Sequence, residues 1–390
     1  MERNIKLSVL LGIWGSLQFH QPVFALFYTL SKGFTLQQFF YCLSTYFLAS
    51  LLAEIPTGSY SDRVSRRRSL IIAWVVGTSA TLTMLLTQSF WVMLLANAVA
   101  GVGSAFASGT DNALLYDSLV TLKRQKEFKA LSGRMGWYGG LAMAFSAALG
   151  GFVAQWDITY AWWVGFVVGS ASIVPLLLLQ EPPIARADTK EESYVTHLKD
   201  SMRRGLQGDA GYFVWYAVGV WFFFSIGFWL WQPYLKLIEL PLAWFGLLYA
   251  AMNIVGGFAS KHADLLEKRL GMRRSLLVIP LLLAAAFVLE SRIVLWFSFV
   301  FIAVQSVSSG FFSTVLNDYI NARIPSERRA TILSFKNGLN SLLFCVLSPL
   351  VGYHVDVFSL QTTLLLLAAA LTVTTIVLWC FLPRASRLES

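Results

Sequence analysis

Residues Glu54–Leu70 read EIPTGSYSDRVSRRRSL, a charged stretch between two strongly apolar runs. The surrounding chain makes this stretch unusual, because 56% of the 390 residues are hydrophobic and only 13% are charged. Soluble domains carry about 25% charged residues, and the mean hydropathy of this chain is +0.62. The composition therefore predicts a membrane protein in which the charged stretch connects two membrane-spanning segments.

Apolar runs of roughly 20 residues, each long enough to cross the ~30 Å hydrocarbon core as a helix, recur along the whole chain. Strict alternation of apolar and polar residues is missing, which disfavours an outer-membrane barrel. We therefore expect an all-α polytopic membrane protein. Its twelve predicted spans lie at about residues 6–30, 35–58, 69–87, 90–119, 131–155, 160–180, 211–237, 242–262, 274–290, 293–319, 331–354 and 360–382.

The longest connection between predicted spans lies at residues 181–210. It divides the chain into a six-helix bundle at residues 1–180, a connecting loop, and a second six-helix bundle at residues 211–390. The loop is either a flexible linker or, near residues 193–205, an amphipathic helix on the membrane surface.

Positive charge collects in alternate connections between the predicted spans. The formal net charge is +9, and basic clusters such as Arg66–Arg68 fall on one side of the membrane, whereas the other side holds little beyond Lys32, Lys236 and Arg292. The positive-inside rule places the basic side and both termini in the cytoplasm. The charge thus indicates topology and not a nucleic-acid partner.

The three cysteines do not form a recognisable site. Cys42, Cys345 and Cys380 lie in apolar runs without the spacing of metal ligands. We expect neither a disulfide nor a metal site.

The two halves repeat each other weakly at an offset of about 200 residues. The segment SGTDNALLYDSL (Ser108–Leu119) aligns with SGFFSTVLNDYI (Ser309–Ile320), and further on SGRMG aligns with SFKNG. These matches pair Asp117 with Asp318 and Arg134 with Lys336. Similar halves of six spans imply a pseudo-two-fold axis along the membrane normal, with a binding site between the halves.

The opening stretch has a recognisable spacing: Gly58, three residues, Asp62-Arg63, two residues, then Arg66-Arg67. This resembles the signature loop of the major facilitator superfamily, which usually reads G-x-x-x-D-R-x-G-R-R. Ser65 stands where the family prefers glycine. Together with the six-plus-six arrangement, the resemblance covers the whole chain.

The resemblance implies a monomeric secondary transporter that works by alternating access in a bacterial cytoplasmic membrane. Its partners would be a small-molecule substrate, protons and the lipid bilayer, with no cofactor. The sequence has no nucleotide-binding loop and no nucleophile elbow, so we expect no enzyme activity and a gradient as the energy source.

In the superfamily, contacts of the signature loop hold the cytoplasmic side closed. Asp62 would accept hydrogen bonds from the start of the span at 331–354, and Arg63 or a following arginine would pair with Asp117. Small residues such as glycine allow helices to approach closely. The repeat adds two equivalent acid–base pairs, Asp117 with Arg134 and Asp318 with Lys336, one in each half. The predicted gate residues are therefore Gly58, Asp62, Arg63, Arg67, Asp117, Arg134, Asp318 and Lys336. The alternative is that the arginines only determine topology.

Ionisable side chains inside predicted spans are candidates for proton coupling, because they are costly in hydrocarbon. Glu54, Asp111 and His20 are these candidates. The structural alternatives are a tie between Glu54 and the gate arginines, a pair between Asp111 and an arginine, and a core position or substrate contact for His20. A Gly-Pro-x-x-Gly-Gly element, frequent in superfamily exporters, is matched here by Gly150 and Gly151 without the proline.

Aromatic and amide side chains on the spans that line the family's substrate cavity suit a mid-sized, partly apolar ligand. The predicted cavity residues are Trp14, Gln18, Gln21, Trp137, Tyr138, Trp215, Trp221, Gln305, Asn337 and Asn340. The favoured function is proton-coupled export of a small amphipathic compound such as a drug, a siderophore or another secreted metabolite. The alternatives are proton-coupled import of a nutrient and a non-transporting receptor or scaffold, since the fold does not decide among them.

Overall fold

The computed structural model of the chain describes residues 1–183, 208–324 and 326–382, and each of the twelve predicted spans contains helix. No strand occurs in these ranges, so the predicted all-α class is confirmed. Within them, ten helices are long and apolar enough to cross a membrane. The count of twelve crossings stays a prediction, and the helix expected near 193–205 lies outside the described residues.

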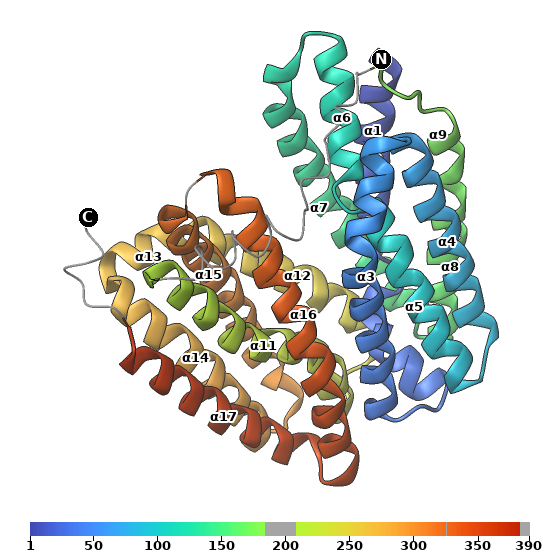
Figure 1. Cartoon of the computed structure of the whole chain (residues 1–390). Coiled ribbons are helices and arrows are strands. Elements are labelled where there is room, and N and C mark those ends of the chain that lie inside the picture. Colours follow the sequence, from blue (N-terminus) through green and yellow to red (C-terminus); the bar gives the residue numbers. More distant parts are fainter. Residues whose placement is uncertain (184–207, 325, 383–390) are drawn as a thin grey trace. The chain divides into compact units, whose positions relative to one another are not determined.

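The chain divides into two compact units, the first of which comprises Met1–Asp188 and Pro241–Ala250. In this unit α3 lies beside α5, and α4 packs against α5 as well (Figure 1). Its helices are α1 (Glu2–Gly15), α2 (Phe24–Leu26), α3 (Leu36–Arg63), α4 (Arg66–Leu86), α5 (Phe90–Ala107), α6 (Thr110–Thr121), α7 (Phe128–Val153), α8 (Ile158–Ala171) and α9 (Ile173–Leu177), with short turns η1 (Gln21–Val23), η2 (Phe27–Ser31) and η3 (Gln125–Glu127).

The second unit comprises Thr189–Leu240 and Ala251–Ser390. Within it α14 packs against both α15 and α17, and its core holds large fully buried side chains such as Trp231, Phe287 and Phe312. Its helices are α11 (Gly208–Leu237), α13 (Ala263–Leu270), α14 (Met272–Arg292), α15 (Val300–Arg323), α16 (Ser326–Val357) and α17 (Leu360–Cys380), with the turn η4 (Trp296–Phe299), and α12 (Leu242–Lys261) contributes residues to both units.

The first predicted span, at residues 6–30, is not one continuous helix. Helix α1 ends at Gly15, and the chain resumes helical turns only at Gln21, beside Pro22. Proline has no N–H and cannot continue an α-helix from the preceding turns. The backbone N–H of Gln18, freed by this break, donates to the buried hydroxyl of Ser146 on α7 at 2.8 Å.

The predicted span at residues 90–119 is also broken. Gly109 adopts a left-handed conformation with φ of +71°, which glycine reaches without strain. It separates α5 from α6 and places Asp111 in the first turn of α6. Phe90–Thr121 still counts as one candidate membrane span, so the break interrupts the helix within a span and lets the Asp111 carboxylate accept the N–H of Asn112 in the new first turn.

The expected loop at residues 58–68 is mostly helical. Helix α3 continues to Arg63 and α4 begins at Arg66, so only Val64 and Ser65 connect them. Ser65 has an extended backbone, and its Oγ accepts the N–H of Arg68 at 3.1 Å. Serine therefore caps α4 at the position where the family prefers glycine, and it does so without strain.

Candidate functional site

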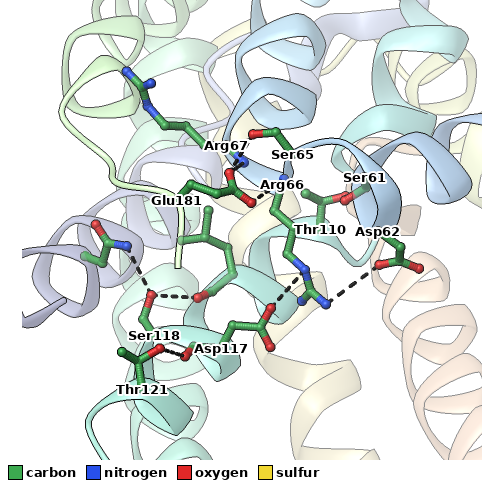
Figure 2. A network of polar contacts seen from close by, with 12 residues as sticks. Ser61, Asp62, Ser65, Arg66, Arg67, Thr110, Asp117, Ser118, Thr121 and Glu181 are labelled. Carbon is green, nitrogen blue, oxygen red and sulfur yellow. Dashed lines mark hydrogen bonds and ion pairs between the residues drawn. The ribbon is translucent and has the colours of Figure 1, made fainter. Parts of the chain in front are cut away.

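The carboxylate of Glu181 binds the first turn of α4 (Figure 2). It accepts the Ser65 hydroxyl at 2.6 Å and the backbone N–H groups of Arg66 and Arg67 at 3.0 and 2.9 Å. The first N–H groups of a helix have no partner within the helix and carry its positive pole, so a carboxylate there is strongly favoured. Glu181 thus fixes the end of the first bundle to the charged stretch.

Arg66 joins three helices of the first unit. Its Nε lies 3.0 Å from Oδ2 of Asp117 on α6, and its Nη2 lies 3.7 Å from Oδ1 of Asp62 at the end of α3 (Figure 2). The side chains of Arg66 and Asp117 are 22% and 15% exposed, whereas that of Asp62 is 72% exposed. The stronger contact is therefore the half-buried pair with Asp117.

Two hydroxyl contacts extend this arrangement. Thr110 donates to Ser61 at 3.0 Å, which joins α6 to α3. The buried amide of Asn4 on α1 donates to Ser118 on α6 at 3.1 Å and to the carbonyl of Gln180 at 2.7 Å. We call the set Asn4, Ser61, Asp62, Ser65, Arg66, Arg67, Thr110, Asp117, Ser118 and Glu181 the polar network; it ties α1, α3, α4 and α6 together at one end of the first unit.

The predicted gate residues of the first unit take different places. Asp62 and Asp117 both contact Arg66, while Arg67 donates from its side chain to the carbonyl of Leu177 at 2.8 Å. Arg63 and Arg134 are exposed. Apart from the nearby backbone of α3, none of the described residues has a heavy atom within 4 Å of a Cβ placed on Gly58, so the structure does not show the close helix approach expected there. We expected Arg63 or a following arginine to pair with Asp117. In the structure the arginine that pairs with Asp117 is Arg66.

The second unit does not form the ion pair expected between Asp318 and Lys336. Lys336 donates instead to Asn317 at 3.0 Å, and within the described ranges Asp318 is exposed and makes no ion pair. At the same end of the unit, the Tyr319 hydroxyl contacts Glu267 of α13 at 2.6 Å. Helical geometry explains the difference, because neighbouring residues point about 100° apart and α15 presents Asn317 to Lys336.

The first unit holds a cavity of about 630 Å³. Three of the predicted cavity residues line it: Trp14, Gln18 and Gln21. Two of the proton-coupling candidates, His20 and Asp111, line it as well. The breaks at Gly15 and Gly109 position these side chains, so polar groups converge on a largely apolar cavity within this unit.

The other predicted cavity residues are dispersed. Gln305 lines a second cavity of about 280 Å³, which lies within the second unit. Trp221 packs in an aromatic cluster with Phe224 and Phe312. The buried Oδ1 of Asn340 has no hydrogen-bond partner among the residues that the structure describes. The side chains of Trp137, Tyr138, Trp215 and Asn337 are exposed.

Glu54, the third proton-coupling candidate, is exposed on α3. His20 packs against the rings of Phe24 and Trp162, with centroids 6.0 and 4.8 Å away. Asp111 is exposed, and its Oδ1 accepts the N–H of Asn112 at 2.7 Å. Among the residues that the structure describes, no group of three or more His, Cys, Asp or Glu side chains is placed to hold a metal ion.

Of the polar network, only Asp62, Arg67 and Asp117 were among the predicted site residues. Sequence reasoning missed the other seven, namely Asn4, Ser61, Ser65, Arg66, Thr110, Ser118 and Glu181, and one buried acid, Glu290. Ser65 could have been found because a serine directly before a helix start is a cap signal. Glu181 could have been found because it is an acid that directly follows a predicted span on the side of the membrane where the basic clusters lie. Glu290 was hidden by its position, because the predicted span at 274–290 ended on it. Its burial, 1% exposed, comes from tertiary packing.

A family model described as Major Facilitator Superfamily matches residues 8–289 and 235–390. The chain belongs to this superfamily. It is therefore a membrane transporter by family, as the signature stretch predicted.

This chain aligns over part of its length with two curated relatives. It is 23% identical over 233 residues to the tetracycline resistance protein, class E, of Escherichia coli, and the match covers 56% of each chain. It is 26% identical over 138 residues to the MFS-type transporter tstD of Talaromyces stipitatus, which covers 35% of this chain and 24% of that protein. The chain thus spans about half or less of the length of these relatives.

Solved structures with low sequence identity share the superfamily fold over the whole chain. The nucleoside transporter NupG matches with a TM-score of 0.80 and 12% identity, over 98% of this chain and 100% of that chain. A D-xylose-proton symporter matches with a TM-score of 0.71 and 15% identity, over 97% and 98%. At these identities the likeness shows the fold alone.

Proposed function

We propose that this superfamily member is a proton-coupled exporter of a small amphipathic compound, working by alternating access in a bacterial cytoplasmic membrane. The observation that carries the proposal is the alignment over 233 residues with a tetracycline resistance protein. A transporter that confers resistance to a drug acts most directly by moving that drug out of the cell. Export of a related amphipathic compound is therefore the function that the alignment favours.

The cavity of the first unit supports the substrate class. Its volume, about 630 Å³, falls within the range of roughly 300–1,000 Å³ that small-molecule sites occupy. Trp14 offers an aromatic face, and Gln18 and Gln21 offer amide groups that donate and accept hydrogen bonds. This combination suits a ligand with both ring surface and polar groups, and it does not suit a bare inorganic ion.

Proton coupling is assigned first to Asp111, with Glu54 and His20 as further candidates. Asp111 and His20 line the same cavity as Trp14, Gln18 and Gln21, so a proton and a substrate would compete there for one set of polar groups. Competition of this kind is what an antiporter requires. Within the polar network we assign the gate role to the ion pairs of Arg66 with Asp62 and Asp117, because partly hydrated ion pairs contribute only about 1 kcal/mol or less and break at modest cost.

Everted membrane vesicles with a respiratory proton gradient test the proposal. A fluorescent amine dye reports the acid interior, and a panel of tetracyclines, dyes, other antibiotics and metal chelators is added to wild-type vesicles. We expect at least one compound to collapse the gradient in part. The collapse should be lost in Asp111→Asn or Glu54→Gln and kept in Asp264→Asn, a matched change at an exposed carboxylate of α13.

The contrary outcome is that no compound moves protons although the protein is folded and inserted. The exporter proposal would then be wrong. Uptake of the same compounds, with sugars and nucleosides added, into right-side-out cells would next be measured, and gradient-driven accumulation there would establish the import alternative.

A further inference from the structure

Glu290 carries a buried carboxyl group on an apolar helix of the second unit. It lies in the last turn of α14 and is 1% exposed. The preceding turn holds Ala286 and Phe287, both fully buried. Burial in an apolar surrounding without compensation strongly disfavours an ionised side chain. The partners of Glu290 therefore decide its charge.

Gln305 on α15 is the partner of this carboxyl group. Its Nε2 lies 2.7 Å from Oε1 and 2.8 Å from Oε2 of Glu290. Both side chains are buried, so the contact is enclosed within the unit. No ion pair of the described residues includes Glu290, and an amide supplies no charge to balance a carboxylate.

In the part of the chain that the structure describes, the elements around Glu290 bring no cation to it. On α11, Tyr234 directs its hydroxyl to Ser298 and to the carbonyl of Ile293, and Lys236 is exposed. Arg292, on α14 itself, is exposed too. Helix α17 has no charged residue, and the charged groups of α15 and α13, namely Asp318, Arg323, Asp264, Glu267, Lys268 and Arg269, belong to the opposite end of these helices from Gln305 and Glu290.

The helix itself adds to the cost of a negative charge. The last carbonyl groups of a helix form its negative pole, and an anion in the last turn is unfavourable. A protonated carboxyl group avoids this cost. In the structure Nε2 of Gln305 faces both carboxyl oxygens. If the amide turns so that its oxygen also faces the acid, the acid O–H donates to the amide oxygen while the amide N–H donates to the acid carbonyl, and both groups are satisfied.

Gln305 also reaches the cavity of about 280 Å³ in this unit. Its Oε1 would lie 2.9 Å from a Cβ placed on Gly227 of α11, so the side chain is held closely between helices. Phe224, Phe228 and Asn253 line the same cavity. One amide therefore touches both the buried carboxyl group and the space in which a ligand would sit.

We propose that Glu290 is a proton-binding group of the second unit and that Gln305 relays its protonation state to this cavity. When the O–H bond of Glu290 breaks, its proton passes to water and the carboxylate draws the amide N–H groups of Gln305. The N–H groups of Gln305 then turn from the cavity to the carboxylate of Glu290. A ligand with an ammonium or another N–H donor would take their place in the cavity and would stabilise this carboxylate. Such coupling is reciprocal, so proton release would also strengthen ligand binding.

This assignment rests on the proposed proton coupling, but its site lies in the other unit and involves none of the groups named above for coupling. A direct test needs no substrate. Infrared spectra of the purified protein in an ester-free detergent, at about pH 7, report protonated carboxyl groups through their C=O stretching band, because exposed carboxyl groups are ionised there.

We expect this band in the wild type, its loss in Glu290→Gln, and no change in Glu239→Gln, a matched change at an exposed residue of the same unit. In Gln305→Leu the band should persist at higher frequency, because the acid carbonyl loses its donor. Absence of the band from folded wild type, or its survival in Glu290→Gln, would overturn the proposal. Failure of Glu290→Gln to fold would also count against it, because glutamine closely resembles a protonated glutamate.

The relay has its own test once the vesicle screen has supplied a substrate. Binding of that substrate to detergent-solubilised protein should release protons in the wild type, and Glu290→Gln should release fewer. If the infrared band is present and no compound dissipates the gradient, the exporter proposal fails alone. If a compound dissipates the gradient and the band is absent, the Glu290 assignment fails alone.

Discussion

The Nε atom of Arg66 lies 3.0 Å from Oδ2 of Asp117, which joins the first turn of α4 to α6. Both side chains are largely shielded from solvent, at 22% and 15% exposure. Removal of one partner from a pair in this setting costs more than it does in a surface ion pair, because it leaves a shielded charge without its counterion. The pair should therefore matter both for stability and for the gate.

Removal of the guanidinium in Arg66→Ala should destabilise the first unit by about 1–3 kcal/mol. Thermal unfolding of the protein in detergent measures the change as a lower midpoint. Arg68→Ala, at an exposed position of the same turn, should have little effect. The double variant Arg66→Ala with Asp117→Asn should lose less than the sum of the two single variants; strict additivity would show that the pair contributes nothing.

The cap at Glu181 leads to a local prediction. Glu181→Ala removes the acceptor of two backbone N–H groups, those of Arg66 and Arg67. Loss of a helix cap costs about 0.5–2 kcal/mol. Hydrogen–deuterium exchange should therefore accelerate at the start of α4, and less so in Glu181→Gln, which keeps one acceptor oxygen. Unchanged exchange in Glu181→Ala would mean that water replaces the carboxylate without loss.

A third prediction concerns acid pH. Hydrogen bonds from Arg124 hold the pKa of Glu127 below its ordinary value of 4.5, and they raise the pKa of Arg124. A lowered carboxyl pKa contributes stability above the ordinary value, and this contribution is lost as pH falls through the folded-state pKa. The wild type should therefore be more stable than Glu127→Gln near neutral pH, and the difference should vanish in acid.

The group is exposed, so the difference should be small and should shrink with added salt. Unfolding midpoints across the acid range, at low and high ionic strength, provide the measurement. A difference between wild type and Glu127→Gln that stays constant with pH would contradict the assignment to the Arg124 contact.

The sequence allowed the fold to be predicted because long apolar runs and the spacing from Gly58 to Arg67 are local features. Asp117 was identified for the same reason, through its place in the repeat. The choice of Arg66 over Arg63 was not predictable, since it depends on the direction in which α3 and α4 present their side chains. The two breaks, at Gly15 and Gly109, and the burial of Glu290 likewise result from packing between distant segments.

The break after α1 leads to the last prediction. A Cβ placed on Gly150 of α7 would overlap the carbonyl oxygen of Phe19, which belongs to the non-helical stretch between α1 and η1. Backbone cannot move aside as a flexible side chain can, so Gly150→Ala should shift this stretch and lower the unfolding midpoint. Gly140→Ala, on the same helix, would meet no atom within 4 Å and should raise stability by up to about 1 kcal/mol.

Because Gln18 and His20 flank Phe19 and line the cavity of the first unit, Gly150→Ala should also weaken binding of any substrate found in the vesicle screen. Equal midpoints and equal substrate responses for the two variants would show that the close approach at Gly150 does not hold the break in place.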